Sequence, residues 1–319
     1  RQLSYQVSSV WPTYDYLTTK PVYIILRNDD GTHPRGYLLN PNGSIPEGSY
    51  VLPTSESSGL ELYRNDNFVA EAQAVLGDEG LFNFADLKIN GDSYFLIRSK
   101  LKKQYTFYDE YKDQDHNWVP LILIHEMFHI YQIDAWTYPK SAIQDFQNYP
   151  LTVEIMKYEL ALFDLMNHSH YVNGEVSARE VLAKYVVLYE ELFERDPTGS
   201  MLVKNMGSFI QYLEGSARYV EHFTALGSIY PSINIDPTHG WGVYLDHINS
   251  GEMIRSVFAV RTWYHVGSGA IHLLKEANAN VEVELAAGKT PYEIAGDWLD
   301  LTQEEKDLVR ARIAIELDW

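Results

Sequence analysis

One stretch of the sequence decides the fold and carries most of its chemistry: Pro120-Leu121-Ile122-Leu123-Ile124-His125-Glu126-Met127-Phe128-His129-Ile130-Tyr131-Gln132. On an α-helix, residues four apart share a face, so the imidazoles of His125 and His129 can reach one metal ion. Glu126 then lies on the neighbouring side, where its carboxylate can hold a water bound to that metal. Pro120 suits a first helical turn. Because apolar residues flank both histidines, we expect a buried helix.

The His-Glu-x-x-His pattern is specific for a chain of this composition. With 11 His among 319 residues, an accidental match is expected about 0.03 times. The alternative interpretation is a pair of core histidines that donate hydrogen bonds to backbone carbonyls. For a lone histidine that interpretation would be favoured, but here two histidines and a carboxylate share one apolar helix. The sequence therefore predicts a metal site on this helix.

Composition limits which ligands and which partners are available. The chain has 25 Lys and Arg against 44 Asp and Glu, a formal net charge of -19, and no cysteine. The acidity excludes nucleic acid and anionic lipid as expected partners, since both require clustered basic residues. Without cysteine, any metal must be bound by His, Asp or Glu. Hydrophobic residues make up 45% of the chain, which is enough for a sizeable core.

The residues before the motif read as a β-rich lobe, 1–115. Short β-branched runs bounded by turn residues predict its strands, and one apolar stretch predicts a short helix. The expected strands are Pro21–Leu26 with Gly36–Leu39 as its partner, Ser93–Ile97 and Gln104–Tyr108, and the expected helix is Val69–Leu76.

From 116 to 319 the apolar period changes to that of helices. Ser177-Ala178-Arg179-Glu180 has the capping-box pattern in front of a helix that reaches Glu194, and Thr290 and Thr302 have the same pattern. Further helices are expected over 200–226, 251–277 and 303–316. The sequence thus predicts an α+β fold, with a β-containing N-terminal lobe and a mostly helical C-terminal lobe.

A zinc site needs a third protein ligand and an open position for water. The segment Leu213-Glu214-Gly215-Ser216-Ala217-Arg218-Tyr219-Val220-Glu221 supplies a candidate in Glu214, which lies among apolar residues. Glu221 follows two helical turns later on the same face, where it can accept a hydrogen bond from the outer nitrogen of a ligand histidine. The alternative is an ordinary amphipathic helix with two exposed glutamates.

These motifs together resemble the gluzincin zinc metallopeptidases, in particular the aminopeptidase-N-like branch that includes leukotriene A4 hydrolase. The resemblance rests on His125-Glu126-Met127-Phe128-His129, on Glu214-Gly215 with Glu221 seven residues on, and on Tyr264-His265-Val266-Gly267. The matches cover about 35 residues, in the family's order.

The resemblance implies a thermolysin-like fold in which both lobes form one catalytic unit around a cleft. It also implies one Zn²⁺ per chain, bound by His125, His129 and Glu214. In that family Glu126 would be the general base, and the hydroxyl of Tyr264 would steady the oxyanion. His265 and His239 are alternatives to Tyr264 for that last role.

The sequence departs from the family pattern in two places. In that branch the third ligand closely follows the second histidine, whereas here 84 residues separate His129 from Glu214. The Gly-x-Met-Glu-Asn segment that grips a free amino terminus is also missing. We therefore expect zinc-dependent hydrolysis of peptide bonds in a peptide or protein substrate, without assigning aminopeptidase activity.

Two other functions stay open at this level: a catalytically silent, peptidase-like binding protein, and a zinc hydrolase of a non-peptide substrate. The chain begins at Arg1, without Met, and no apolar run approaches the length of a membrane span. These observations favour an exported protein, periplasmic, cell-surface or secreted, whose signal segment has been removed. An extended strand near Gln104–Tyr108 is a candidate for binding substrate backbone. The sequence leaves the oligomeric state undetermined.

Overall fold

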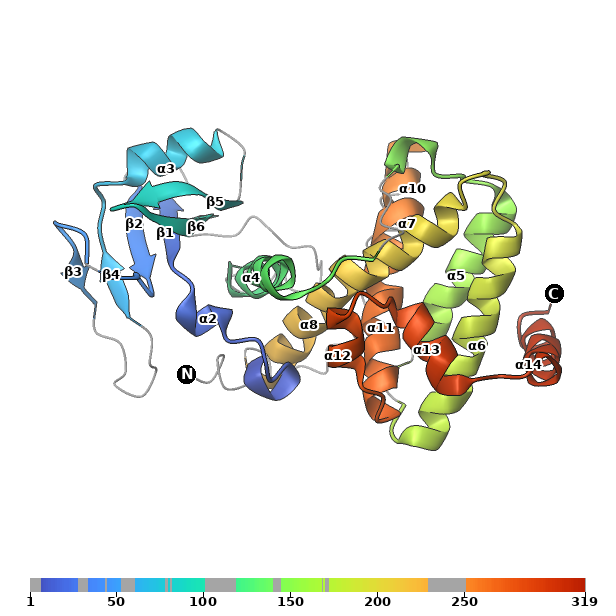
Figure 1. Ribbon diagram of the computed structural model, residues 1–319. Coiled ribbons are helices and arrows are strands. Elements are labelled where there is room, and N and C mark those ends of the chain that lie inside the picture. Colours follow the sequence, from blue (N-terminus) through green and yellow to red (C-terminus); the bar gives the residue numbers. More distant parts are fainter. Residues whose placement is uncertain are drawn as a thin grey trace. The chain divides into compact units, whose positions relative to one another are not determined.

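The computed structural model describes residues 7–27, 34–43, 45–52, 61–77, 80, 82–100, 119–139, 145–167, 169, 172–228 and 251–318. The chain forms two compact units, Arg1–Tyr131 with Phe223–Ser232, and Gln132–His222 with Ile233–Trp319. A mixed sheet lies in the first unit and most helices lie in the second (Figure 1). The fold is therefore α+β, as predicted.

The sheet has six strands in the order β3-β4-β2-β1-β6-β5. Their bounds are β1 Val22–Arg27, β2 Arg35–Leu39, β3 Tyr50–Val51, β4 Leu62–Arg64, β5 Phe82–Ile89 and β6 Asp92–Lys100. The predicted pairing of the first two strands is confirmed, because β1 and β2 are antiparallel with Val22 opposite Leu39. The strand predicted at Ser93–Ile97 lies inside β6, which runs parallel to β1.

Helix α3 (Val69–Leu76) has the bounds predicted for it and covers one face of the sheet (Figure 1). Its buried residues Val69, Ala72 and Leu76 share a helical face and belong to the same apolar cluster as Ile25 and Leu96. Spacings of three and four residues place such side chains in one stripe. That stripe completes the core of the sheet.

Helix α4 (Val119–Ala135) carries the motif, and its residues 123–129 are buried, as predicted. Phe128 contacts two aromatic rings from the N-terminal segment edge-on, Trp11 at 5.2 Å and Tyr14 at 5.1 Å between ring centroids. The Tyr14 hydroxyl donates to the Ile124 carbonyl at 3.1 Å. Aromatic packing and one buried hydrogen bond therefore fix α4 from the side of its apolar residues.

The second unit is a bundle of helices, two of which contain π segments. The elements are η2 Phe146–Asn148, α5 Val153–Asn167, α6 Glu175–Glu194, α7 Leu202–Ile210, η4 Gln211–Gly215, α8 Ser216–Ser228 (whose residues from Phe223 on belong to the first unit), α10 Gly251–Ser256, η5 Val257–Arg261, α11 Thr262–Glu276, α12 Val281–Ala286, α13 Pro291–Leu299 and α14 Gln303–Glu316. Elements η4 and η5 are π-helical. The helices predicted over 200–226 and 251–277 are thus continuous runs, each with a π segment inside it. No helix within the described ranges combines the length and apolar character needed to cross a bilayer.

Two of the three predicted capping boxes form. Thr290 and Thr302 each accept from the backbone N–H three residues on, and the glutamate there accepts in return. The box predicted at Ser177 is wrong, because α6 begins earlier, at Glu175, after Gly174. Gly174 has φ 83°, a conformation that favours glycine. Its N–H donates to the Glu276 carboxylate at 3.1 Å, so a distant residue helps set this helix start.

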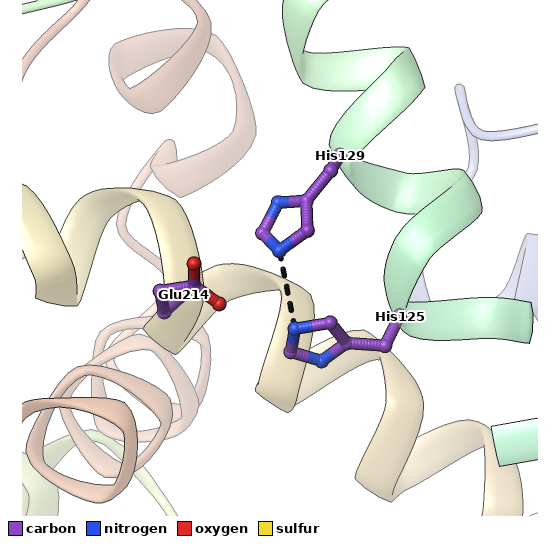
Figure 2. Close-up of side chains that lie close together, drawn as sticks. All are labelled: His125, His129 and Glu214. Atoms are coloured by element: carbon purple, nitrogen blue, oxygen red, sulfur yellow. Dashed lines mark hydrogen bonds between the residues drawn. The ribbon is translucent and has the colours of Figure 1, made fainter. Parts of the chain in front are cut away.

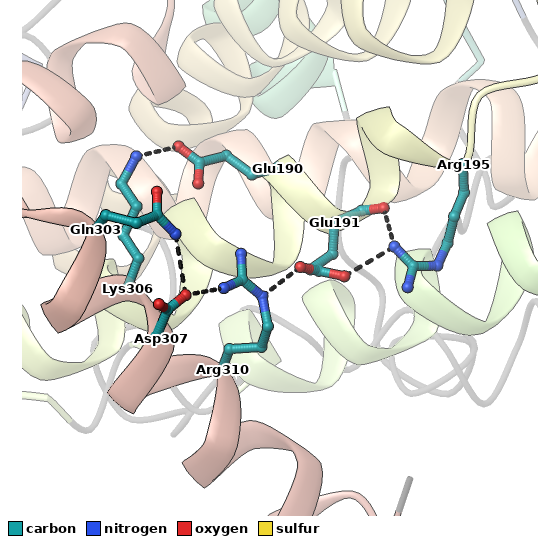
Figure 3. A network of polar contacts seen from close by, with 7 residues as sticks. All are labelled: Glu190, Glu191, Arg195, Gln303, Lys306, Asp307 and Arg310. Carbon is teal, nitrogen blue, oxygen red and sulfur yellow. Dashed lines mark hydrogen bonds and ion pairs between the residues drawn. The ribbon is translucent and has the colours of Figure 1, made fainter.

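Helix α14 lies along α6 and is attached mainly by charged side chains (Figure 3). Lys306 binds Glu190 at 2.6 Å, and Arg310 binds Glu191, which also accepts from Arg195 at 2.8 Å. Ile313 is the residue of α14 that is buried. This contact is therefore largely polar.

Candidate metal centre

The two histidines of the motif lie one turn apart on α4, as predicted, and both are buried at 8% exposure. Their rings are nearly perpendicular, at 84°, and their Nε2 atoms are 3.1 Å apart. The α-helical spacing produces this approach, since it places both imidazoles over the same part of the helix surface. Both rings therefore direct the same kind of nitrogen at one point.

The Glu214 carboxylate completes a group of three possible ligands. Taking one ligand atom from each of His125, His129 and Glu214, all lie within 4.8 Å of one another (Figure 2). Glu214 comes from the π segment η4, far along the chain from the histidines, and it is half-buried. The three residues that the sequence suggested as ligands are thus brought together.

This donor set fits zinc. Two imidazole nitrogens and one carboxylate oxygen form a known catalytic zinc ligand set, with the fourth position left to water. Zinc–nitrogen bonds of about 2.0–2.1 Å in a tetrahedron hold two nitrogens about 3.3 Å apart. The Nε2 atoms here are 3.1 Å apart, which is close to that separation.

Glu126 lies next to the ligand pair but on another side of α4. It directly follows His125 in the chain, which turns it by about 100° around the helix axis. Its side chain is 9% exposed. A buried carboxylate beside two imidazoles is suited to proton transfer, because little bulk water competes for its proton.

A close helix crossing joins the turn that carries Glu214 to the helix that carries Tyr264. A Cβ added to Gly215 would lie 2.7 Å from the Gly267 Cα, and one added to Gly267 would lie 2.7 Å from the Gln211 Cα and carbonyl oxygen. Only residues without a side chain allow two backbones to approach this closely. The glycines of both resembling motifs therefore form one contact, α11 against η4, and Tyr264 lies one turn from it.

The other predicted site residues have diverse surroundings. Glu221 is buried and accepts from the Arg218 guanidinium at 2.7 Å, so its hydrogen bond to a ligand histidine stays a prediction. His265, one alternative to Tyr264, packs its ring edge-on against Phe163 at 5.5 Å between centroids. His239, the other alternative, and the strand Gln104–Tyr108 lie outside the described residues.

Two residues near Glu214 were not predicted from the sequence. Burial and the negative charge of Glu214 raise the pKa of Tyr138, which lies in the segment after α4. Gln132 is fully buried, and its Nε2 donates to the Leu213 carbonyl at 2.9 Å and to the Ser216 hydroxyl at 2.7 Å. Its position was informative, since it continues the face of His125 and His129 by three residues.

The chain matches no protein-family model, no curated protein and no solved structure. Two buried imidazoles on α4 and one carboxylate on η4 place their ligand atoms within 4.8 Å of one another.

Proposed function

We propose that this protein is a zinc-dependent hydrolase of peptide bonds, with one Zn²⁺ bound by His125, His129 and Glu214. The observation that carries the proposal is the convergence of three buried or half-buried ligand atoms within 4.8 Å of one another. Zinc, when bound, supplies a Lewis acid that polarises the scissile carbonyl and lowers the pKa of a coordinated water to about 7.

Glu126 is the general base in this proposal. Its position directly beside His125, inside a buried helix, supports the assignment. The carboxylate takes one proton from the attacking water as the oxygen bonds to the carbonyl carbon. It then gives that proton to the leaving amine as the carbon–nitrogen bond breaks, which returns Glu126 to its charged form.

Tyr264 is the proposed donor to the oxyanion that develops on the carbonyl oxygen. The close contact between Gly215 and Gly267 supports the assignment, because it holds the turn of Tyr264 near the turn of Glu214. A well-placed donor of this kind lowers the barrier by about 2.7–4 kcal/mol. The carbonyl oxygen gains charge only in the transition state, so the hydroxyl favours that state over the substrate.

Metal analysis and one substitution test the proposal. Purified protein should contain, or take up, one zinc per chain. The Glu126→Gln variant should keep that zinc and lose cleavage of a peptide library by at least about 100-fold, the range for a positioned general base. A protein that binds no zinc contradicts the proposal. Wild-type protein that binds zinc and cleaves no peptide supports a binding protein or a different substrate instead.

A further inference from the structure

Gln132 links the helix of the two histidines to the turn of the third ligand. It lies three residues after His129, and its side chain is fully buried. Both of its amide hydrogens have acceptors on the same turn, the Leu213 carbonyl at 2.9 Å and the Ser216 hydroxyl at 2.7 Å. These two acceptors flank Glu214 in the chain.

The turn that receives these bonds is irregular and needs such partners. In a regular α-helix the Ser216 N–H would donate to the Tyr212 carbonyl, but here it donates to the Leu213 carbonyl. The Ser216 hydroxyl donates to the Tyr212 carbonyl instead, at 2.6 Å. Gln132 donates to that hydroxyl and so completes a chain of hydrogen bonds from α4 through Ser216 to η4.

We infer that Gln132 is a positioning residue for the third metal ligand. Its two hydrogen bonds fix the π segment against α4 and hold the Glu214 carboxylate near His125 and His129, where the three ligand atoms lie within 4.8 Å of one another. Gln132 itself does not touch the metal. The inference rests on the proposed zinc site and adds to it the device that aligns a carboxylate from one helix with imidazoles from another.

The chain offers a closely matched control in Asn65. This residue is also fully buried, and its Nδ2 also donates to one carbonyl, of Glu47 at 3.1 Å, and to one serine hydroxyl, of Ser49 at 2.9 Å. Asn65 lies in the sheet region, after β4, and none of its partners flanks a possible ligand. Replacing each amide by an apolar side chain of similar size removes the same kind of bonds.

The experiment compares Gln132→Met and Asn65→Leu with the wild type. Zinc affinity is measured by competition with a chromophoric chelator, thermal stability is measured on metal-free protein, and Co²⁺ is added as a spectroscopic probe of ligand number and geometry. Both variants should lose thermal stability. Gln132→Met alone should bind zinc about 10–100-fold more weakly and show a changed Co²⁺ absorption spectrum.

The outcomes separate this inference from the proposed function. Wild-type protein that takes up no zinc overturns both. If the wild type binds zinc and Gln132→Met binds it equally tightly, the positioning role alone is overturned. The positioning role is also overturned if Asn65→Leu loses as much zinc affinity as Gln132→Met. If Gln132→Met does not fold, Ser216→Ala retains the glutamine and removes one acceptor. It should then weaken zinc binding in the same direction, and unchanged affinity there would overturn the inference.

Discussion

Two helix contacts in the second unit differ in what holds them together. At the crossing of α11 and η4, glycine meets glycine and the backbones approach so closely that one added methyl group would lie 2.7 Å from main-chain atoms. Along α14 and α6, by contrast, charged side chains span the gap in pairs that water reaches (Figure 3). The first contact depends on shape and the second on charge.

Precise backbone placement matters at the glycine crossing more than at the charged contact. The glycine crossing lies beside the possible ligand Glu214 and beside Tyr264, so a small displacement there would shift both of these side chains. The charged contact lies far along the chain from these residues and buries only Ile313 of α14. Exposed ion pairs adapt by changing rotamers, whereas two backbones in contact have no such freedom.

Breaking the glycine crossing should have the largest effect. We expect Gly267→Ala to lower the free energy of unfolding by about 3 kcal/mol, the upper end for an overpacked core, because its neighbours are backbone atoms that cannot rotate away. Zinc affinity should fall as well, since η4 must shift. Urea unfolding and zinc titration measure both quantities.

Gly296 supplies the control for that prediction. It lies within a helix, α13, and a Cβ added there meets no atom within 4 Å. Gly296→Ala should therefore raise stability by about 1 kcal/mol, the helix preference of alanine over glycine. A Gly267→Ala variant that gained stability in the same way would show that the crossing tolerates a side chain.

A second test asks whether water reaches the interior of the second unit. Glu159 on α5 is fully buried, and the Tyr149 hydroxyl donates to it. Burial raises the pKa of Glu159 well above its ordinary value of 4.5. Above pH 4.5 the folded chain therefore keeps a proton that the unfolded chain releases, so stability falls as pH rises toward the folded pKa.

Glu159→Gln removes that titration. Relative to wild type, the variant should gain about 1.4 kcal/mol of unfolding free energy for each pH unit above about 5, until the folded pKa is passed. Urea unfolding at several pH values between 5 and 8 measures the gain. Parallel curves for the two proteins would mean that the carboxylate is ionised in the folded state and that water reaches it.

The smallest effect is expected at the charged contact. Arg310→Ala removes the ion pair with Glu191 and should lower stability by about 0.2–1 kcal/mol, the range for pairs that solvent reaches. The difference from wild type should shrink in 1 M salt, where charges are screened within about 3 Å. Zinc affinity should not change. A salt-independent loss, or a loss of zinc binding, would contradict the contrast between the two contacts.

The parts of the fold that the sequence predicted depend on local signals. Helix α3, the helix of the motif and the caps at Thr290 and Thr302 follow from residues within a few positions of each other. The hairpin of β5 and β6 had such a signal as well, in Asn90-Gly91, where both residues have positive φ. The short strands β3 and β4 have no strong local signal, and they form because β4 pairs with β2 and β3 pairs with β4.

For the site, the sequence suggested which residues to bring together but not how. His125 and His129 follow from helical spacing, and Glu214 required the resemblance as well. The hydrogen bonds of Gln132 could not be predicted, because their acceptors lie 81 and 84 residues away in the chain. The π geometry of η4 and η5 could not be predicted either, since Gln-Tyr-Leu-Glu-Gly and Val-Phe-Ala-Val-Arg contain no pattern that distinguishes a π turn from an α turn.

Because Glu214 lies in a π segment, the direction of its side chain depends on the number of residues in this helix. A π turn closes hydrogen bonds between residues five apart rather than four, so it accommodates one residue more than an α turn. Deleting a single codon within 211–215 would remove that extra residue, so the helix could return to regular bonding with its flanking turns in register, while side chains inside the segment changed direction. Glu214 could keep its identity while its carboxylate turned away from the histidines. In genetic terms, this stretch should tolerate many substitutions more readily than one insertion or deletion.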